Sequence, residues 1–142
     1  MKILFVCHGN INRSAAGEII LKKLKPDWEV KSAALKDTKG GEITAKKMRE
    51  ALKEFGYQTD GIRSTPISEE LIQWADVVFY MDNSNEKKLN ERFSNYSSKF
   101  KRISKLVNID KVPDPNFSPG TEMHKQVIKI LEKSLEIFIN EH

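Results

Sequence analysis

The first apolar run of the chain ends in a cysteine, and a short loop closed by an arginine and a serine follows it. Residues 3–6 are continuously apolar, which is typical of a central parallel strand. Cys7 comes next, and residues 14–25 have helical spacing that stops at Pro26. A strand is therefore expected to end near Cys7 and a helix to begin near Ser14, with a tight loop between them.

A loop at such a junction can hold an anion. The first backbone N–H groups of a helix lack intrahelical partners, and a curled loop aims them at one point with the helix dipole behind them. Phosphate fits this arrangement, and the same field favours the thiolate form of a cysteine at its base. Cys7 is therefore a candidate nucleophile, Arg13 a bidentate partner for phosphate oxygens, and Ser14 a hydrogen-bond donor to the sulfur.

The expected phosphate-binding residues are those of the loop itself: His8, Gly9, Asn10, Ile11, Asn12, Arg13 and Ser14. Gly9 and Asn10 suit a curled backbone because both tolerate left-handed conformations. His8 is expected at the pocket mouth rather than as a catalytic base, because the loop itself activates the thiolate. The plainer alternative is a buried strand-end cysteine with Arg13 solvated on the first helical turn.

Further strands and helices alternate along the chain. The expected strands cover residues 28–34, 76–80 and 100–103, and the expected helices cover residues 44–55 with Thr44 as the cap, 68–74 with Ser68 as the cap, 82–93, and a last helix beginning between Ser118 and Thr121. This alternation predicts one α/β domain, residues 1–142, with a parallel sheet and helices on both faces.

Composition excludes several function classes. No stretch approaches the ~20 apolar residues of a membrane span, and the first apolar run is interpreted as a strand rather than a signal peptide. One cysteine excludes an internal disulfide and suits the cytoplasm. The net charge of +4 comes from scattered lysines, without the basic stripe of a nucleic-acid partner. The three histidines, His8, His124 and His142, have no metal-ligand spacing.

The motif Val-Cys-x-Gly-Asn-x-x-Arg-Ser over residues 6–14 resembles the phosphate loop of low-molecular-weight protein tyrosine phosphatases. The run Val-Pro-Asp-Pro over residues 112–115 strengthens the resemblance, because a late Asp-Pro pair supplies the general acid in that family. The resemblance covers nearly the whole chain. It implies the strand order 2-1-3-4, a phosphocysteine intermediate and no metal or cofactor. A phosphorylated protein or small phosphoester would be the substrate of a cytoplasmic monomer.

The resemblance also assigns residues outside the loop. Asp114 would be the general acid, although Asp-Pro is also turn chemistry. Ser32 would brace the phosphate loop, or it is simply a strand-end serine bonded to local backbone. Asp82 lies after a predicted strand and can bond the phosphate loop or the Asp114 loop, with helix capping as the favoured alternative. Ile11, Asn116 and Phe117 would form the pocket wall.

Several positions depart from the family pattern. Asn12 stands where many members carry a second cysteine, and Ile62 where many carry a histidine that supports the loop. Asn116 replaces the usual aromatic residue after Asp-Pro, and residues 35–41 contain no aromatic wall residue. Phosphotyrosine is the first expected substrate because Ile11 offers an apolar surface, while phosphoarginine and other aryl phosphates stay open.

Three other functions share parts of this pattern. An arsenate reductase needs further cysteines to complete its redox cycle, and the chain has only one. A phosphocysteine carrier has no need of Arg13 or Asp114, and a phosphoprotein-binding module has no need of Cys7. Repeated release of free phosphate separates an enzyme from a carrier or a binding domain.

Overall fold

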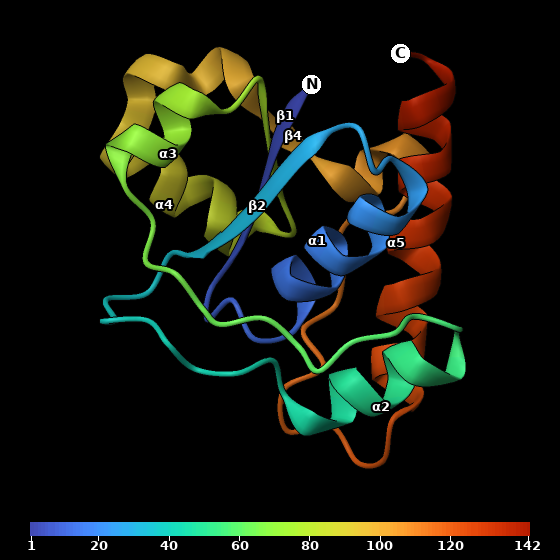
Figure 1. Ribbon diagram of the computed structural model, residues 1–142. Coiled ribbons are helices and arrows are strands. Elements are labelled where there is room, and N and C mark those ends of the chain that lie inside the picture. The colour runs from blue at the N-terminus through green and yellow to red at the C-terminus, as the bar shows by residue number, and fades with distance from the viewer.

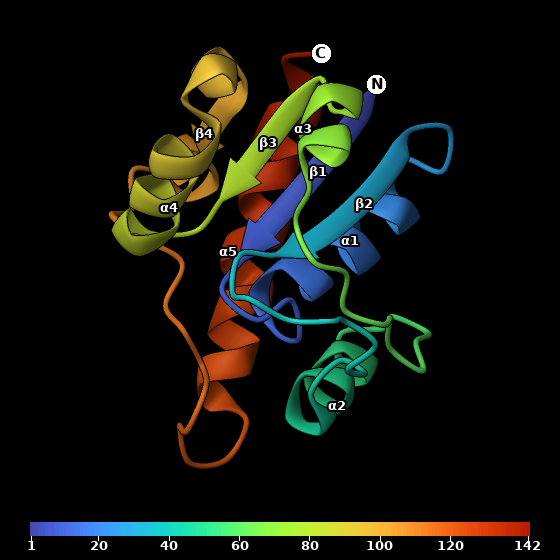
Figure 2. The ribbon, with the colours of Figure 1, turned by 90° about the vertical axis from the view of Figure 1, so that its left-hand side faces the viewer.

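Four parallel strands form one sheet in the order β2-β1-β3-β4, as the resemblance implied. Figure 1 shows the course of the chain, and Figure 2 shows the four strands side by side in this order. The computed structural model describes residues 1–142. In chain order the elements are β1 (Lys2–Cys7), α1 (Arg13–Leu24), β2 (Glu29–Ala34), α2 (Lys46–Glu54), α3 (Glu69–Trp74), β3 (Val77–Tyr80), α4 (Asn83–Phe93), the 3-10 helix η1 (Ser94–Lys99), β4 (Phe100–Arg102), the 3-10 helix η2 (Ile103–Val107) and α5 (Glu122–Asn140).

Helices cover both faces of the sheet, which confirms the predicted layers (Figure 2). Successive residues of β1 point to opposite faces, and all of them are buried after Lys2. Phe5 packs in the larger core cluster with α1, α2 and α5, whereas Leu4 and Val6 pack in the smaller cluster with α3 and α4. Strand β1 is thus buried on both sides, as its continuous apolar run predicted.

Close packing of α1 on the sheet requires a glycine in its second turn. A Cβ atom built on Gly17 would lie 2.7 Å from the ring of Phe5, so no larger residue fits without movement of the ring. This contact fixes the first turns of α1 against β1. The loop between the two elements is therefore held at both ends.

Two predicted helix starts are wrong. Helix α2 begins at Lys46, with Ala45 as its cap, because the Thr44 side chain is bonded elsewhere. Thr44 Oγ1 accepts a hydrogen bond from Ile62 N at 2.9 Å and lies 3.2 Å from the carbonyl oxygen of the same residue. Helix α5 begins at Glu122, just after the predicted range, whereas Ser68 caps α3 as expected.

The carboxyl ends of the strands carry the segments that meet at the site. Leu35 N donates to Cys7 O and Lys36 N donates to His8 O, each at 2.9 Å, so the pairing of β2 with β1 continues past both strands. On the other side, Val112 N donates to Met81 O at 3.0 Å. This bond anchors the Asp114 segment at the same sheet edge, which is where open parallel sheets bind ligands. None of the helices combines the length and the apolar composition that a membrane span requires.

Candidate active site

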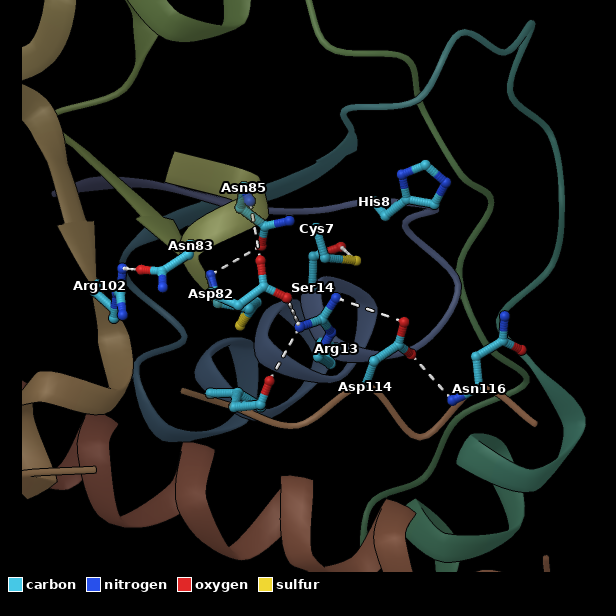
Figure 3. Close-up of polar contacts among 12 residues, drawn as sticks. Cys7, His8, Arg13, Ser14, Asp82, Asn83, Asn85, Arg102, Asp114 and Asn116 are labelled. Carbon is cyan, nitrogen blue, oxygen red and sulfur yellow. Dashed lines mark hydrogen bonds and ion pairs between the residues drawn. The ribbon is translucent and has the colours of Figure 1, made fainter. Parts of the chain in front are cut away.

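The Cys7 side chain lies at the base of the loop between β1 and α1. The residue is 3% exposed, and its Sγ lies 3.0 Å from Ser14 Oγ (Figure 3). Asn10 N donates to the same sulfur at 3.3 Å. A backbone N–H and a hydroxyl thus both stabilise a thiolate at this position.

Asn10 braces the loop from within. Its φ of 57° is left-handed, the conformation that both Gly9 and Asn10 tolerate, whereas the φ of Gly9 is not positive. The side-chain amide donates to Ser14 Oγ at 2.8 Å and to Ser32 Oγ at 2.9 Å. Its carbonyl oxygen accepts from Thr65 N at 3.0 Å. The main chain at Thr65 therefore supports the loop through Asn10.

Ser32 contacts the loop through Asn10 and is itself held by Glu18. Ser32 Oγ donates to Glu18 Oε1 at 2.6 Å, and Lys22 Nζ lies 2.5 Å from the other carboxylate oxygen. Glu18 is buried on α1 and was not expected at the site. Its helical spacing from Ser14 was the available signal, because residues four apart share one face of a helix.

The Arg13 side chain connects the phosphate loop to the segments that follow β3. Its Nη1 donates to Asp82 Oδ2 at 2.7 Å and to Val112 O at 3.0 Å, and its Nη2 lies 3.9 Å from Asp114 Oδ2. Figure 3 shows the guanidinium between the two carboxylates, so the solvated-arginine alternative is excluded. A buried guanidinium with its fork fixed in this way is oriented for bidentate contact with an oxyanion.

Asp82 serves both roles that the sequence left open. It caps α4 by accepting from Asn85 N at 2.9 Å, and it pairs with Arg13. Burial alone would raise the pKa of the Asp82 carboxyl, but the hydrogen bonds from Arg13 and Asn85 outweigh burial and hold the pKa below its ordinary value. Asp82 is therefore an ionised partner that orients Arg13.

Asp114 faces the loop while taking part in a turn. Its side chain is half-exposed, and its carboxylate accepts a hydrogen bond from Asn116 N at 3.0 Å. The cavity between Asp114 and the loop has a volume of about 70 Å³ and is lined by Cys7, His8, Gly9, Ile11, Asn12, Arg13, Lys36, Asp114 and Asn116. Drug-sized ligands need roughly 300 Å³ or more, so this cavity fits only a small group of a substrate.

Larger surface hollows lie elsewhere and lack the combination of a cysteine, an arginine and a nearby carboxylate. One of about 560 Å³ lies beside Tyr57 and Lys53 and is lined by neither a cysteine nor an arginine. The chemistry therefore places the candidate site in the smaller cavity. No group of three or more His, Cys, Asp or Glu side chains is arranged to hold a metal ion.

Two residues at the pocket mouth differ from expectation. Phe117 was expected as a pocket wall, but its side chain is 97% exposed and does not line the cavity. The physical reason is its left-handed φ of 66° in the turn that Pro115 and Ser118 close, which directs the ring outward. Lys36, which lines the cavity, was not predicted, because a lysine in a polar loop has no distinguishing pattern.

His8 lies at the mouth, as expected. Its Nδ1 is 3.1 Å from Lys88 Nζ, and in Figure 3 the ring points away from Cys7. Burial and then the neighbouring charges of Lys88 and Lys36 lower the pKa of the His8 imidazole. The ring does not contact the sulfur, so this geometry gives it no role as the base that activates Cys7.

Comparisons with known proteins identify the family and the fold of the chain. The model of the family "Low molecular weight phosphotyrosine protein phosphatase" matches residues 2–141. The structure of a protein tyrosine phosphatase from Entamoeba histolytica superimposes with a TM-score of 0.90 at 33% identity, covering 99% of this chain and 96% of that one. A protein-arginine-phosphatase of Bacillus subtilis is 30% identical, over 95% of this chain and 92% of its own. The low molecular weight phosphotyrosine protein phosphatase of Sus scrofa is 26% identical, over 94% and 93%.

Proposed function

Because the chain belongs to the low molecular weight phosphotyrosine protein phosphatase family, we propose that it hydrolyses phosphorylated protein side chains, with phosphotyrosine as the preferred substrate. One observation carries the proposal. A buried cysteine, a fixed arginine and an Asp-Pro carboxylate line one small cavity at the carboxyl end of the sheet.

In the first step, the Cys7 thiolate attacks the phosphorus atom in line with the leaving oxygen. A sulfur–phosphorus bond forms as the phosphorus–oxygen bond breaks, and protonated Asp114 gives its proton to the leaving oxygen. Arg13 and the loop N–H groups stabilise the equatorial oxygens throughout. General acid catalysis of this kind contributes about 10²- to 10⁴-fold.

In the second step, water hydrolyses the phosphocysteine. Asp114, now a carboxylate, accepts a proton from the attacking water, and the phosphorus–sulfur bond breaks to release inorganic phosphate and the Cys7 thiolate. The Ser14 hydroxyl, 3.0 Å from the sulfur, stabilises the departing thiolate. Cys7 and Asp114 therefore act in both steps with reversed roles: Cys7 is first the nucleophile and then the leaving group, and Asp114 is first the acid and then the base.

The proposal also distinguishes phosphotyrosine from phosphoarginine as the substrate. Relatives of similar identity are named as tyrosine and as arginine phosphatases, so overall similarity does not separate the two. Ile11 in the cavity wall favours the apolar face of a phosphotyrosine ring over a polar phosphoguanidine. With Asn116 at the wall and Phe117 turned outward, we expect weak binding of simple aryl phosphates combined with normal chemistry.

We also propose where the protein works, its oligomeric state and its cofactor requirement. The chain would work in the cytoplasm, where a lone thiolate stays reduced, and as a monomer on phosphorylated proteins. It would need neither a metal nor another cofactor, because Arg13 and the loop N–H groups supply the positive potential for the phosphoryl oxygens.

The decisive experiment measures repeated phosphate release from p-nitrophenyl phosphate in mild acid, with EDTA and a reductant present. We expect many turnovers by the wild type, none by Cys7→Ser, and a rate about 10²- to 10⁴-fold lower for Asp114→Ala. Asp27→Ala, an exposed aspartate far from the loop, is the matched control and should keep full activity. Release of at most one phosphate per chain would identify a phosphocarrier or a phosphate-binding domain instead.

A further inference from the structure

We infer that Lys36 selects substrates that carry an anionic group beside the phosphorylated side chain, and that Glu42 forms an ion pair with this lysine when no substrate is bound. The inference rests on the proposed phosphatase activity and narrows its substrate class. An acidic phosphotyrosine segment fits this description, whereas a phosphoarginine side chain, with its guanidinium cation beside the phosphoryl group, does not.

The sheet fixes the position of Lys36. Its backbone N–H donates to His8 O at 2.9 Å, one residue after the Leu35 N–H bonds Cys7 O, so the β-type pairing carries Lys36 alongside the phosphate loop. Its Nζ lies 3.9 Å from the place where a Cβ on Gly9 would stand. The Lys36 ammonium group therefore lies beside Gly9, and both residues line the cavity.

Glu42 holds the ammonium group in the unliganded structure. Lys36 Nζ lies 3.3 Å from Glu42 Oε1, with side chains that are 31% and 50% exposed. The Glu42 backbone is anchored, because its N–H donates to Ser64 Oγ at 3.0 Å and its carbonyl oxygen accepts from Ser64 N at 2.7 Å. A half-exposed ion pair is worth little, so an incoming carboxylate can replace Glu42 at low cost.

Besides His8, the basic side chains that line the cavity are Arg13 and Lys36. Arg13 is buried, is paired with Asp82 and faces the phosphoryl position, whereas Lys36 is held by the half-exposed carboxylate of Glu42. Asp114 is the only acidic side chain among the lining residues. Lys36 is therefore the lining cation that can pair with a substrate charge next to the phosphoryl group.

A general role for Lys36 in attracting phosphate makes a different prediction. If Lys36 only strengthened binding of the phosphoryl group, its removal would reduce kcat/KM for every phosphorylated substrate by the same factor. A selecting role changes the ratio between acidic and neutral substrates, because electrostatic complementarity acts mainly on specificity. The ratio, and not the rate, is therefore the readout.

The test uses three phosphotyrosine peptides that differ only in the residue beside phosphotyrosine, which is Glu, Gln or Lys, and a phosphoarginine peptide. At low salt we expect the wild type to favour the Glu peptide over the Gln peptide about 5- to 10-fold in kcat/KM, with the Lys peptide and the phosphoarginine peptide poorer still. Lys36→Gln should bring the ratio close to one, and Lys36→Arg should keep it. Glu42→Gln should raise the ratio about 2- to 5-fold, and adding Lys36→Gln should abolish that gain.

Lys133→Gln, at an exposed position in the middle of α5, makes the same charge change away from the cavity and should leave the ratio unchanged. Turnover with an unchanged ratio in Lys36→Gln, or a wild-type preference for the phosphoarginine peptide, would overturn the inference while leaving the phosphatase activity intact. Absence of turnover on all four peptides would overturn the proposed function itself, so the two failures are distinguishable.

Discussion

Arg13 Nη1 and Asp82 Oδ2 lie 2.7 Å apart, with side chains that are 4% and 20% exposed. Asp82 also caps α4, so one carboxylate links the loop that holds the nucleophile to the helix that follows β3. The orientation of the phosphate-binding guanidinium is therefore determined by an element about 70 residues away in the chain. A buried ion pair of this kind is costly to break from one side, because it leaves an uncompensated charge.

Replacement of Asp82 should affect both stability and turnover. We expect Asp82→Ala to lower the free energy of unfolding by about 3 kcal/mol, through loss of the cap and of the partner of Arg13. The kcat on p-nitrophenyl phosphate should fall about 10- to 100-fold, because a misplaced guanidinium no longer fits the transition state. Asp82→Asn keeps the cap and should lose less stability in urea denaturation. Equal losses in the two variants would contradict this assignment.

The same pair should contribute to stability in a pH-dependent way. The pKa of the folded-state carboxyl of Asp82 lies below its ordinary value of 3.8, so its contribution is fully present above about pH 4 and is lost as the pH falls through the folded-state pKa. Urea denaturation of wild type and Asp82→Asn from pH 7 to pH 3 checks this. The difference in unfolding free energy between wild type and Asp82→Asn should be constant near neutrality and shrink in acid. A difference that grows in acid would contradict the lowered pKa of Asp82.

Asn10 should matter through its side chain and not only through its backbone conformation. Asn10→Gly keeps the left-handed conformation accessible but removes the bonds to Ser14, Ser32 and Thr65. We expect a loss of about 1 to 3 kcal/mol of stability and weaker competitive inhibition by inorganic phosphate. Asn10→Ala adds backbone strain and should be worse. A glycine variant with wild-type phosphate inhibition would show that the loop holds its shape without these bonds.

Gly17→Ala should destabilise the protein although alanine favours helices. The helix gains about 1 kcal/mol in propensity, but the new Cβ would lie 2.7 Å from the buried ring of Phe5, and overpacking costs about 1 to 3 kcal/mol. We therefore expect a lower urea midpoint. Gly17→Ala combined with Phe5→Leu should recover part of the loss, and a Gly17→Ala protein more stable than wild type would contradict the contact.

Oxidation should inactivate the enzyme without an internal protective disulfide. Cys7 is the only cysteine of the chain, so it has no partner for an internal disulfide. We expect peroxide to drive Cys7 to sulfinic and sulfonic acids, or to mixed disulfides when another thiol is present, which mass spectrometry can identify. Inorganic phosphate should slow the loss. Complete recovery of activity after peroxide, without any thiol adduct, would contradict this vulnerability.

Much of this site could be predicted from patterns among neighbouring residues in the sequence. The apolar run of β1 and the helical spacing of α1 predicted where Cys7 and Ser14 would lie, because both signals depend only on neighbouring residues. The Ser68 cap was predicted for the same reason. The position of Asp82 after β3 predicted two possible roles, a helix cap and a partner of the phosphate loop. Only the fold shows that one carboxylate performs both.

The remaining features depend on contacts between distant segments. Thr44 matches the pattern of a helix cap, yet pairing with Ile62 uses its hydroxyl. Lys36 is an ordinary loop lysine until the register of β2 on β1 places it against Gly9. Phe117 has the composition of a pocket wall, but one left-handed φ directs it outward. Tertiary pairing and single backbone angles of this kind leave no periodic signal in a sequence.

The hydrogen bond from Arg13 to Val112 O joins positions 99 residues apart. At a synthesis rate of about 5 to 20 residues per second, a ribosome that has made the Cys7 loop needs roughly 5 to 20 seconds more to add Asp114. A nascent chain therefore carries the nucleophile and the phosphate-binding arginine well before it carries an acid to protonate a leaving group. Each new molecule becomes a phosphatase only when its last quarter has been made and has docked beside the first.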